Sequence, residues 1–235
     1  ESALKQQLTT VFADLKSQYT FDIYVSDKHD SRNELVELLD DVDSCSDKIS
    51  AKVNDVTGLE FYLLKDGQKT GIRFRGIPNG HEFTSLLLAI LNSDGKGKNF
   101  PDEYITKRVK SLKGPINLTT YVSLTCTNCP DIVQALNIMA ILNPSVSHEM
   151  VDGAINQEEV DALKLQGVPA VFADGELLHV GRGEFGELLS KLETKYGTEE
   201  VLEGEAIVRN YDVVVIGAGP AGSSAAIYSA RKGLK

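Results

Sequence analysis

The cysteines are the residues of this chain best suited to chemistry. Three occur in 235 residues: Cys45 stands alone, whereas Cys126 and Cys129 are separated by two residues in Cys126-Thr127-Asn128-Cys129. A thiolate can attack a partner disulfide, and a second thiol within reach can then resolve the mixed disulfide. Two intervening residues allow this when the pair lies on the first turn of a helix. The spacing therefore predicts a two-electron thiol–disulfide redox centre.

The residues around the pair predict different roles for its two thiols. A strand ends near Leu124, and Pro130 follows the second cysteine, where proline is tolerated because the first helical N–H has no partner. Cys126 then lies just before the helix, where unpaired N–H groups and the positive dipole end lower a thiol pKa. We expect Cys126 to attack, and Cys129, one turn inside the helix and more buried, to resolve.

Two other interpretations of the pair have to be weighed. A zinc site needs about four Cys or His ligands, and the remaining candidates show no paired spacing: Cys45, His29, His81, His148 and His179. We therefore expect no metal. An inert structural disulfide would close only a short loop, which constrains little of the unfolded chain. Cys45 is then a spectator thiol, and the cysteine usage is typical of a reducing cytoplasm, where we place the protein.

Two stretches of the chain repeat one order of elements: strand, helix, strand, β-hairpin, helix. Parallel strands need a helical crossover, and Asp-Gly turns mark hairpins. The second copy carries the cysteine pair, a strand at 146–151, an Asp174-Gly175 turn and a closing helix at 185–192. The first copy has the same features in the same order: a strand at 21–26, a helix at 33–42, a strand at 48–53, a hairpin (61–64 and 72–74) with an Asp66-Gly67 turn, and a helix at 81–91. An extra helix precedes each copy, at 4–15 and 102–112.

The two copies differ at the positions that carry chemistry. His29 and Arg32 fall where the second copy has Cys126 and Cys129, and no proline of the first copy matches Pro169. The first copy therefore cannot perform dithiol chemistry, and we expect it to be structural or partner-binding. The fold class is α/β, with one copy in each of the ranges 1–99 and 100–196.

Composition and the lengths of apolar runs argue against two classes of function. The formal net charge is −10, and no tract of clustered Lys and Arg is present to neutralise phosphates, so nucleic-acid binding is disfavoured. No run approaches the 18 or more apolar residues of a membrane span. Apolar residues make up 42% of the chain and charged residues 25%, as in an ordinary globular protein.

A glycine motif lies near the end of the chain. After an acidic linker at 197–209, a strand at 211–216 leads into Gly217-Ala218-Gly219-Pro220-Ala221-Gly222 and a helix at 223–232. Gly217, Gly219 and Gly222 permit a tight turn, approach of a pyrophosphate and close helix packing. We expect residues 210–235 to be a truncated Rossmann-type strand–turn–helix, the start of a dinucleotide-binding domain. The acidic ribose ligand would fall at or past Lys235, so we expect no cofactor on this chain.

With the order of strand, cysteine pair and helix, the second copy resembles the thioredoxin–glutaredoxin superfamily. Members of that superfamily place a cis proline beside the cysteine pair, and Val168-Pro169 stands 40 residues beyond Cys129, just before a strand. The resemblance implies two tandem thioredoxin-like folds and a site role for Pro169, whose preceding backbone could pair with an extended substrate. A trans proline at an ordinary strand start is the alternative.

The whole order of modules resembles the flavoprotein component of bacterial alkyl hydroperoxide reductase. The likeness is close in three stretches and in the glycine motif: 121–131, 80–86, 167–172 and 217–222. It implies that NADH reduces FAD, that FAD passes electrons through a second cysteine pair of a C-terminal reductase domain to Cys126 and Cys129, and that these reduce a peroxiredoxin. It also implies FAD contacts at Gly217, Gly219 and Gly222, and a homodimer in the intact protein.

The same resemblance singles out one acidic residue of the first copy. The family has a buried Glu near its active dithiol, and Glu82 matches that position, so it could tune the thiols or move protons. An exposed first-turn Glu that stabilises its helix is the alternative. Thr127 departs from the bulkier residue expected in the family, which bears on the redox potential. The competing function is a free-standing general protein disulfide reductase or isomerase of glutaredoxin-like type.

Overall fold

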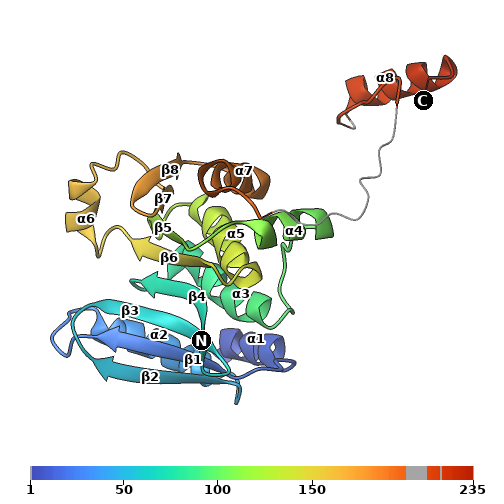
Figure 1. Ribbon diagram of the computed structural model, residues 1–235. Coiled ribbons are helices and arrows are strands. Elements are labelled where there is room, and N and C mark those ends of the chain that lie inside the picture. Colours follow the sequence, from blue (N-terminus) through green and yellow to red (C-terminus); the bar gives the residue numbers. More distant parts are fainter. Residues whose placement is uncertain (1, 200–210, 218, 235) are drawn as a thin grey trace. The chain divides into compact units, whose positions relative to one another are not determined.

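The computed structural model describes residues 2–199, 211–217 and 219–234 (Figure 1). The chain separates into two compact units, Glu1–Glu199 and Glu200–Lys235. Residues 200–209 of the predicted linker lie outside the described residues. The predicted redox pair and both copies of the repeat belong to the first unit.

The first copy contains the elements predicted for it. Its order is helix, strand, helix, strand, hairpin, short 3-10 turn and helix: α1 (Ser2–Phe12), β1 (Tyr19–Val25), α2 (Arg32–Asp43), β2 (Ile49–Asp55), β3 (Leu59–Lys65), β4 (Gln68–Arg75), η1 (Gly80–Glu82) and α3 (Phe83–Ser93). The predicted closing helix thus begins with a separate 3-10 turn, which holds Glu82.

The second copy has the same order with one addition. Its elements are α4 (Glu103–Ser111), β5 (Ile116–Val122), α5 (Cys129–Leu142), β6 (Val146–Asp152), α6 (Gln157–Ala162), β7 (Ala170–Ala173), β8 (Glu176–Val180) and α7 (Phe185–Tyr196). Helix α6 has six residues, none of them buried, so it leaves no apolar periodicity in the sequence.

Both hairpins turn at the Asp-Gly pairs that predicted them. Asp66 and Gly67 have φ values of 50° and 79°, and Asp174 and Gly175 have φ values of 50° and 81°. Two consecutive residues with positive φ give the turn whose twist matches that of the flanking strands. The repeat therefore extends to the backbone conformation of its turns.

The strands of both copies form one eight-stranded sheet in the order β2-β1-β3-β4-β6-β5-β7-β8. Within each half the first two strands pair in parallel and the hairpin strands pair antiparallel. The halves join because β4 pairs in parallel with β6, from Ile72 opposite His148 to Arg75 opposite Val151. The mixed α/β fold is confirmed, whereas the domain limits at 99 and 196 stay a prediction.

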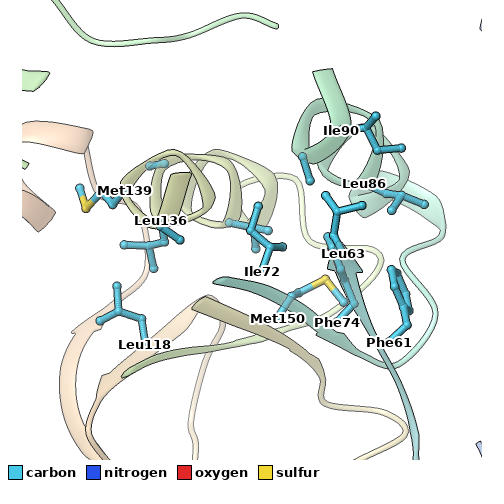
Figure 2. Packing of buried hydrophobic residues seen from close by; sticks show 14 of the residues in the cluster. Phe61, Leu63, Ile72, Phe74, Leu86, Ile90, Leu118, Leu136, Met139 and Met150 are labelled. Atoms are coloured by element: carbon cyan, nitrogen blue, oxygen red, sulfur yellow. The ribbon is translucent and has the colours of Figure 1, made fainter. Parts of the chain in front are cut away.

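The core lies between the middle of this sheet and two helices. Figure 2 shows Leu136 of α5 directed toward Leu118 of the sheet, and Leu86 of α3 beside Leu63. Ten of the fourteen residues of α5 are buried, so this helix is apolar almost all round. It is enclosed by strands below and by α3, α4 and α7 beside it. Such enclosure fixes the N-terminus of α5, where the cysteine pair lies.

In the second unit the predicted strand at 211–216 is wrong. Residues 211–217 have no strand conformation, and Val214 and Ile216 are 71% and 95% exposed. A strand needs a neighbour for its N–H and C=O groups, and the described residues of this unit offer none. The predicted helix is present as α8 (Pro220–Arg231). None of the helices in the described part of the chain is long and apolar enough to cross a membrane.

Candidate functional site: a disulfide at the start of a buried helix

Cys126 and Cys129 form a disulfide between the end of β5 and the start of α5, with their Cα atoms 5.5 Å apart. The loop is closed by a turn in which the Cys126 N–H donates to the Ser123 carbonyl (2.9 Å). Cys126 is half-buried and Cys129 is fully buried, as expected for an attacking and a resolving thiol. Cys129 is the first residue of α5 and does not lie one turn inside it, because the preceding Asn128 is the N-cap.

Pro169 lies beside the pair. The Val168–Pro169 peptide bond is cis, and the Val168 carbonyl oxygen is 3.9 Å from Cys126 Sγ. The loop after β8 is attached here, because the Gly181 N–H donates to the Pro169 carbonyl (2.8 Å). The structure thus brings Cys126, Cys129 and Pro169 together. The backbone of half-buried Val168 lies against the sulfur of half-buried Cys126.

Glu82 of the first copy is fully buried, and neither of its carboxylate oxygens has a hydrogen-bond partner among the described residues. Burial raises the pKa of Glu82 to about 7, the nearby Ser85 hydroxyl opposes this shift, and the Asp131 charge adds to it. Asp131 lies in the first turn of α5. A carboxyl group near neutrality is suited to take and return a proton at physiological pH.

The short turn that carries Glu82 is attached to the loop of the cysteine pair. The His81 N–H donates to the Leu124 carbonyl (3.2 Å), and η1 packs against α5. Gly80 has φ 54°, and a Cβ there would lie 2.7 Å from the Leu124 carbonyl oxygen. Only glycine permits this approach. Glu82 is therefore held against the N-terminal part of the helix that begins with Cys129, and the exposed first-turn alternative is wrong.

A buried polar group lies further along α5. His148 of β6 bonds Asn137 of α5 through Nδ1 (2.7 Å) and Thr120 of β5 through Nε2 (2.8 Å). Burial lowers the pKa of His148 to about 3, so its ring is neutral. Since an amide oxygen only accepts, Nδ1 carries the proton and Nε2 accepts from the Thr120 hydroxyl. This group ties α5 to two strands, and the sequence did not predict it.

Comparison with known proteins assigns the chain to a family. A thioredoxin domain family matches residues 117–193. The F component of alkyl hydroperoxide reductase from Pseudomonas aeruginosa is 41% identical over 238 residues, covering 100% of this chain and 45% of the relative. A Bacillus subtilis protein named NADH dehydrogenase is 41% identical, over 88% of this chain and 40% of its own length. The NTD_N/C domain of alkylhydroperoxide reductase AhpF from Enterococcus faecalis superposes with a TM-score of 0.75 at 30% identity, over 82% of this chain and 99% of that domain.

The chain belongs to the AhpF family of alkyl hydroperoxide reductase components. The resemblance stated from the motifs is thereby confirmed. The chain spans about half the length of the curated relatives it matches. The thioredoxin-domain match includes Cys126, Cys129 and Pro169, whereas Glu82 lies outside it, in the first copy.

The glycine motif forms a tight turn before α8. Gly217 has φ 104°, and a Cβ on Gly222 would lie 2.1 Å from the Gly217 carbonyl oxygen, so both glycines are needed for the turn. A Cβ on Gly219 would meet nothing within 4 Å, so this side of the helix start is open. The residues present fit a pyrophosphate at the N-terminus of α8.

One contact near the disulfide was not predicted from the sequence. Arg182, in the loop after β8, donates through Nε to the Asn128 side-chain oxygen (2.7 Å). Asn128 lies between the cysteines, 54 residues away along the chain, so no local pattern indicates the contact. Gly181 and Gly183 mark the loop as one of close backbone approach, but they do not identify its partner. In the described part of the chain no group of three or more His, Cys, Asp or Glu is arranged to hold a metal.

Proposed function

We propose that this chain is the disulfide-reducing module of a peroxiredoxin reductase, with Cys126 and Cys129 as its electron-carrying dithiol. The observation that carries the proposal is the Cys126–Cys129 disulfide at the first residue of a buried helix, with the Val168 carbonyl beside the half-exposed sulfur. Membership of the AhpF family of alkyl hydroperoxide reductase supports a partner of the peroxide-reducing kind.

The reaction follows from the different burial of the two sulfurs. In the reduced form the Cys126 thiolate attacks one sulfur of the partner disulfide, which forms a mixed disulfide and releases the partner's other sulfur as a thiolate. Cys129 then attacks Cys126 Sγ, so the partner's second sulfur leaves and the Cys126–Cys129 disulfide is restored. Two electrons move from the dithiol to the partner, which gains two protons from the module and solvent.

Glu82 has a place in the second step. Cys129 is fully buried, so its proton needs an acceptor inside the protein when it attacks the mixed disulfide. Glu82 is held against the same helix N-terminus, with a pKa of about 7 and with neither oxygen hydrogen-bonded to another described residue. The carboxylate is suited to accept that proton and return it to solvent when the pair is reduced again.

The intact protein requires a source of electrons. The name of one relative, NADH dehydrogenase, supports NADH as the electron source. Membership of the AhpF family and the glycine motif support FAD in a C-terminal reductase domain, and Gly217, Gly219 and Gly222 are the residues of this chain that would hold the flavin pyrophosphate. The flavin would supply the electron pair taken from NADH. Homodimerisation of the intact protein and a cytoplasmic location, where the buried free Cys45 stays reduced, stay predictions.

The experiment compares two substrates of the reduced chain. Reduced with dithiothreitol and desalted, the chain is mixed with an oxidised peroxiredoxin and, separately, with insulin, and thiols are counted over time. We expect rapid, stoichiometric reduction of the peroxiredoxin and slow reduction of insulin. Equal rates on both would support the general disulfide reductase, and no reduction of either would refute both functions.

A further inference from the structure

Arg182 differs from the other arginines of the compact unit. Residues 2–199 contain five arginines, and four of them form ion pairs with carboxylates: Arg32, Arg73, Arg75 and Arg108. Arg182 forms no ion pair within the described residues and makes one side-chain hydrogen bond, from Nε to Asn128. Arg182 is exposed, and its hydrogen-bond partner belongs to the cysteine motif.

The contact attaches a positively charged side chain to a residue that lies between the two cysteines. Asn128 directly precedes Cys129 and is two residues after Cys126. A pocket of about 370 Å³ opens here, lined by Asn128, Asp131, Arg182, Gly183 and Glu184. Arg182 is the only cation among its lining residues. The first two residues of the loop between β8 and α7 are attached near the pair, because Gly181 bonds Pro169 and Arg182 bonds Asn128.

The loop itself is held by His179 of β8. Lys191 Nζ lies 2.8 Å from His179 Nδ1, so Nδ1 accepts and the proton is on Nε2. Nε2 then donates to the carbonyl oxygens of Gly181 (3.1 Å) and Arg182 (2.9 Å). Gly183 has no room for a side chain, since a Cβ would lie 2.5 Å from His179 Nε2. His179 of β8, held by Lys191 of α7, thus fixes the backbone at Arg182.

We propose that Arg182 is a positioning residue of the dithiol, whose guanidinium, fixed by Asn128, stabilises the Cys126 thiolate. This rests on the proposed role of Cys126 as the attacking thiol. Two carboxylates line the same pocket as Asn128 and Arg182: Asp131 on α5 and Glu184 at the start of α7. Glu82 and His81 lie on η1, which bonds the loop of the pair at Leu124. The three carboxylates raise a thiol pKa when ionised, so Arg182 is the charge that opposes them.

Arg182 can stabilise a Cys126 thiolate only in the reduced state of the pair, because the disulfide carries no charge. Reduction of the disulfide takes up two electrons and one proton to give the Cys126 thiolate and the Cys129 thiol. A guanidinium that stabilises the thiolate lowers the pKa of Cys126 and also favours the reduced form. Replacing Arg182 should therefore raise the pKa of Cys126 and make the pair more strongly reducing.

The test measures the pKa of Cys126 in the full chain carrying Cys129→Ser. The rate of iodoacetamide alkylation of the Cys126 peptide is followed by mass spectrometry between pH 4 and 10, which separates it from Cys45. Arg182→Gln should raise the pKa by about 0.5 to 1 unit, as expected for a partly solvated charge near a thiol. Arg182→Lys, which retains the charge, should restore at least half of the difference.

Lys107→Gln is the matched control. It removes the same charge from the same half of the molecule, on α4, which is attached to the other end of α5 through Asn143 and Val109 (2.9 Å). Asn143 lies fourteen positions after Cys129 along the helix, or about 21 Å away. This variant should leave the pKa of Cys126 within about 0.2 unit of the parent.

The outcomes separate this proposal from the proposed function. An unchanged pKa in Arg182→Gln, or the same shift in Lys107→Gln, overturns the role of Arg182 while peroxiredoxin reduction by the parent still stands. If Arg182→Gln fails to fold, Asn128→Ala decides, since it removes the anchor and should shift the pKa in the same direction. A parent that reduces no disulfide refutes the function, whatever the pKa.

Discussion

The two copies of the repeat have the same strand order, yet the loop before their first crossover helix is held in different ways. In the first copy α2 begins at Arg32, whose guanidinium donates to the Val25 carbonyl (3.0 Å) and pairs with Asp55 (2.8 Å). In the second copy α5 begins at Cys129, which is bonded to Cys126. The same place in the fold thus carries an ion pair in one copy and a disulfide in the other.

The closing helices of the two copies differ in the burial of the glutamate at their start, and here the first copy has the buried group. Glu82-Phe83 and Glu184-Phe185 occupy the same position, with each Glu as the N-cap of its helix. Glu184 is exposed, whereas Glu82 is fully buried without a hydrogen-bond partner in the described part of the chain. A buried, unpaired carboxyl group destabilises the copy that holds it. The comparison suggests that the first copy, inert by itself, contributes this group to the chemistry of the second.

The largest expected effect is on the rate of peroxiredoxin reduction, when the cysteines of the second copy are replaced. Cys126→Ser should lower the rate of peroxiredoxin reduction at least about a thousandfold, since no attacking thiolate remains. Cys129→Ser should instead stop the reaction at the mixed disulfide, visible as a covalent complex on a non-reducing gel.

Cys45→Ala is the control, because Cys45 is a buried free thiol of the first copy. Its turnover should be close to that of the parent at equal folded fraction. A Cys126→Ser chain that still forms the complex, or a Cys129→Ser chain that does not, would reverse the roles given to the two sulfurs.

The next effect concerns the free energy of unfolding. The folded-state pKa of Glu82 is raised from 4.5 to about 7, so the folded protein retains a proton that the unfolded chain loses in this interval. Stability should fall as pH rises from about 4.5 to about 7, by about 3 kcal/mol. Glu82→Gln keeps the shape without the charge, so it should be more stable than the parent by up to about 3 kcal/mol at pH 8 and little different at pH 4.

Urea unfolding at pH 4, 6 and 8 measures this. Glu184→Gln makes the same change at the equivalent exposed position, and it should alter the free energy of unfolding by less than about 0.5 kcal/mol at every pH. A Glu82→Gln chain that gains nothing at pH 8 would show that the carboxyl group has a partner or solvent in the folded state.

These differences also show what the sequence could predict. The cysteine pair and the two Asp-Gly hairpins were found because each depends on a few neighbouring residues, whereas the site role of Pro169 was inferred from the family resemblance. The pairing of β4 with β6 and the contact of Arg182 with Asn128 were not predicted. They bring together residues 54 to 76 positions apart, and no sequence pattern links the partners. The strand expected at 211–216 was wrong because an apolar run forms a strand only beside another strand.

A smaller effect concerns the rate. If Glu82 accepts the proton of Cys129, peroxiredoxin reduction by the parent should rise with pH through about 7 as the carboxyl group ionises. Glu82→Gln should lack this rise and be slower by about tenfold at pH 8, with the difference shrinking toward pH 5. Glu184→Gln should keep the rise. Superimposable pH profiles of parent and Glu82→Gln would leave the first copy as a scaffold.

The smallest effect tests whether the helix start of the first copy has only a structural role. Arg32→Gln removes the ion pair with Asp55 and the bond to the Val25 carbonyl. Asp55 is 69% exposed, so most of the cost comes from the lost backbone contact, and unfolding should become easier by about 1 kcal/mol. The rate of peroxiredoxin reduction at equal folded fraction should be the same as in the parent. A slower reaction with unchanged stability would mean that this end of the first copy also contacts the partner, so that the Arg32–Asp55 ion pair has a functional role as well as a structural one.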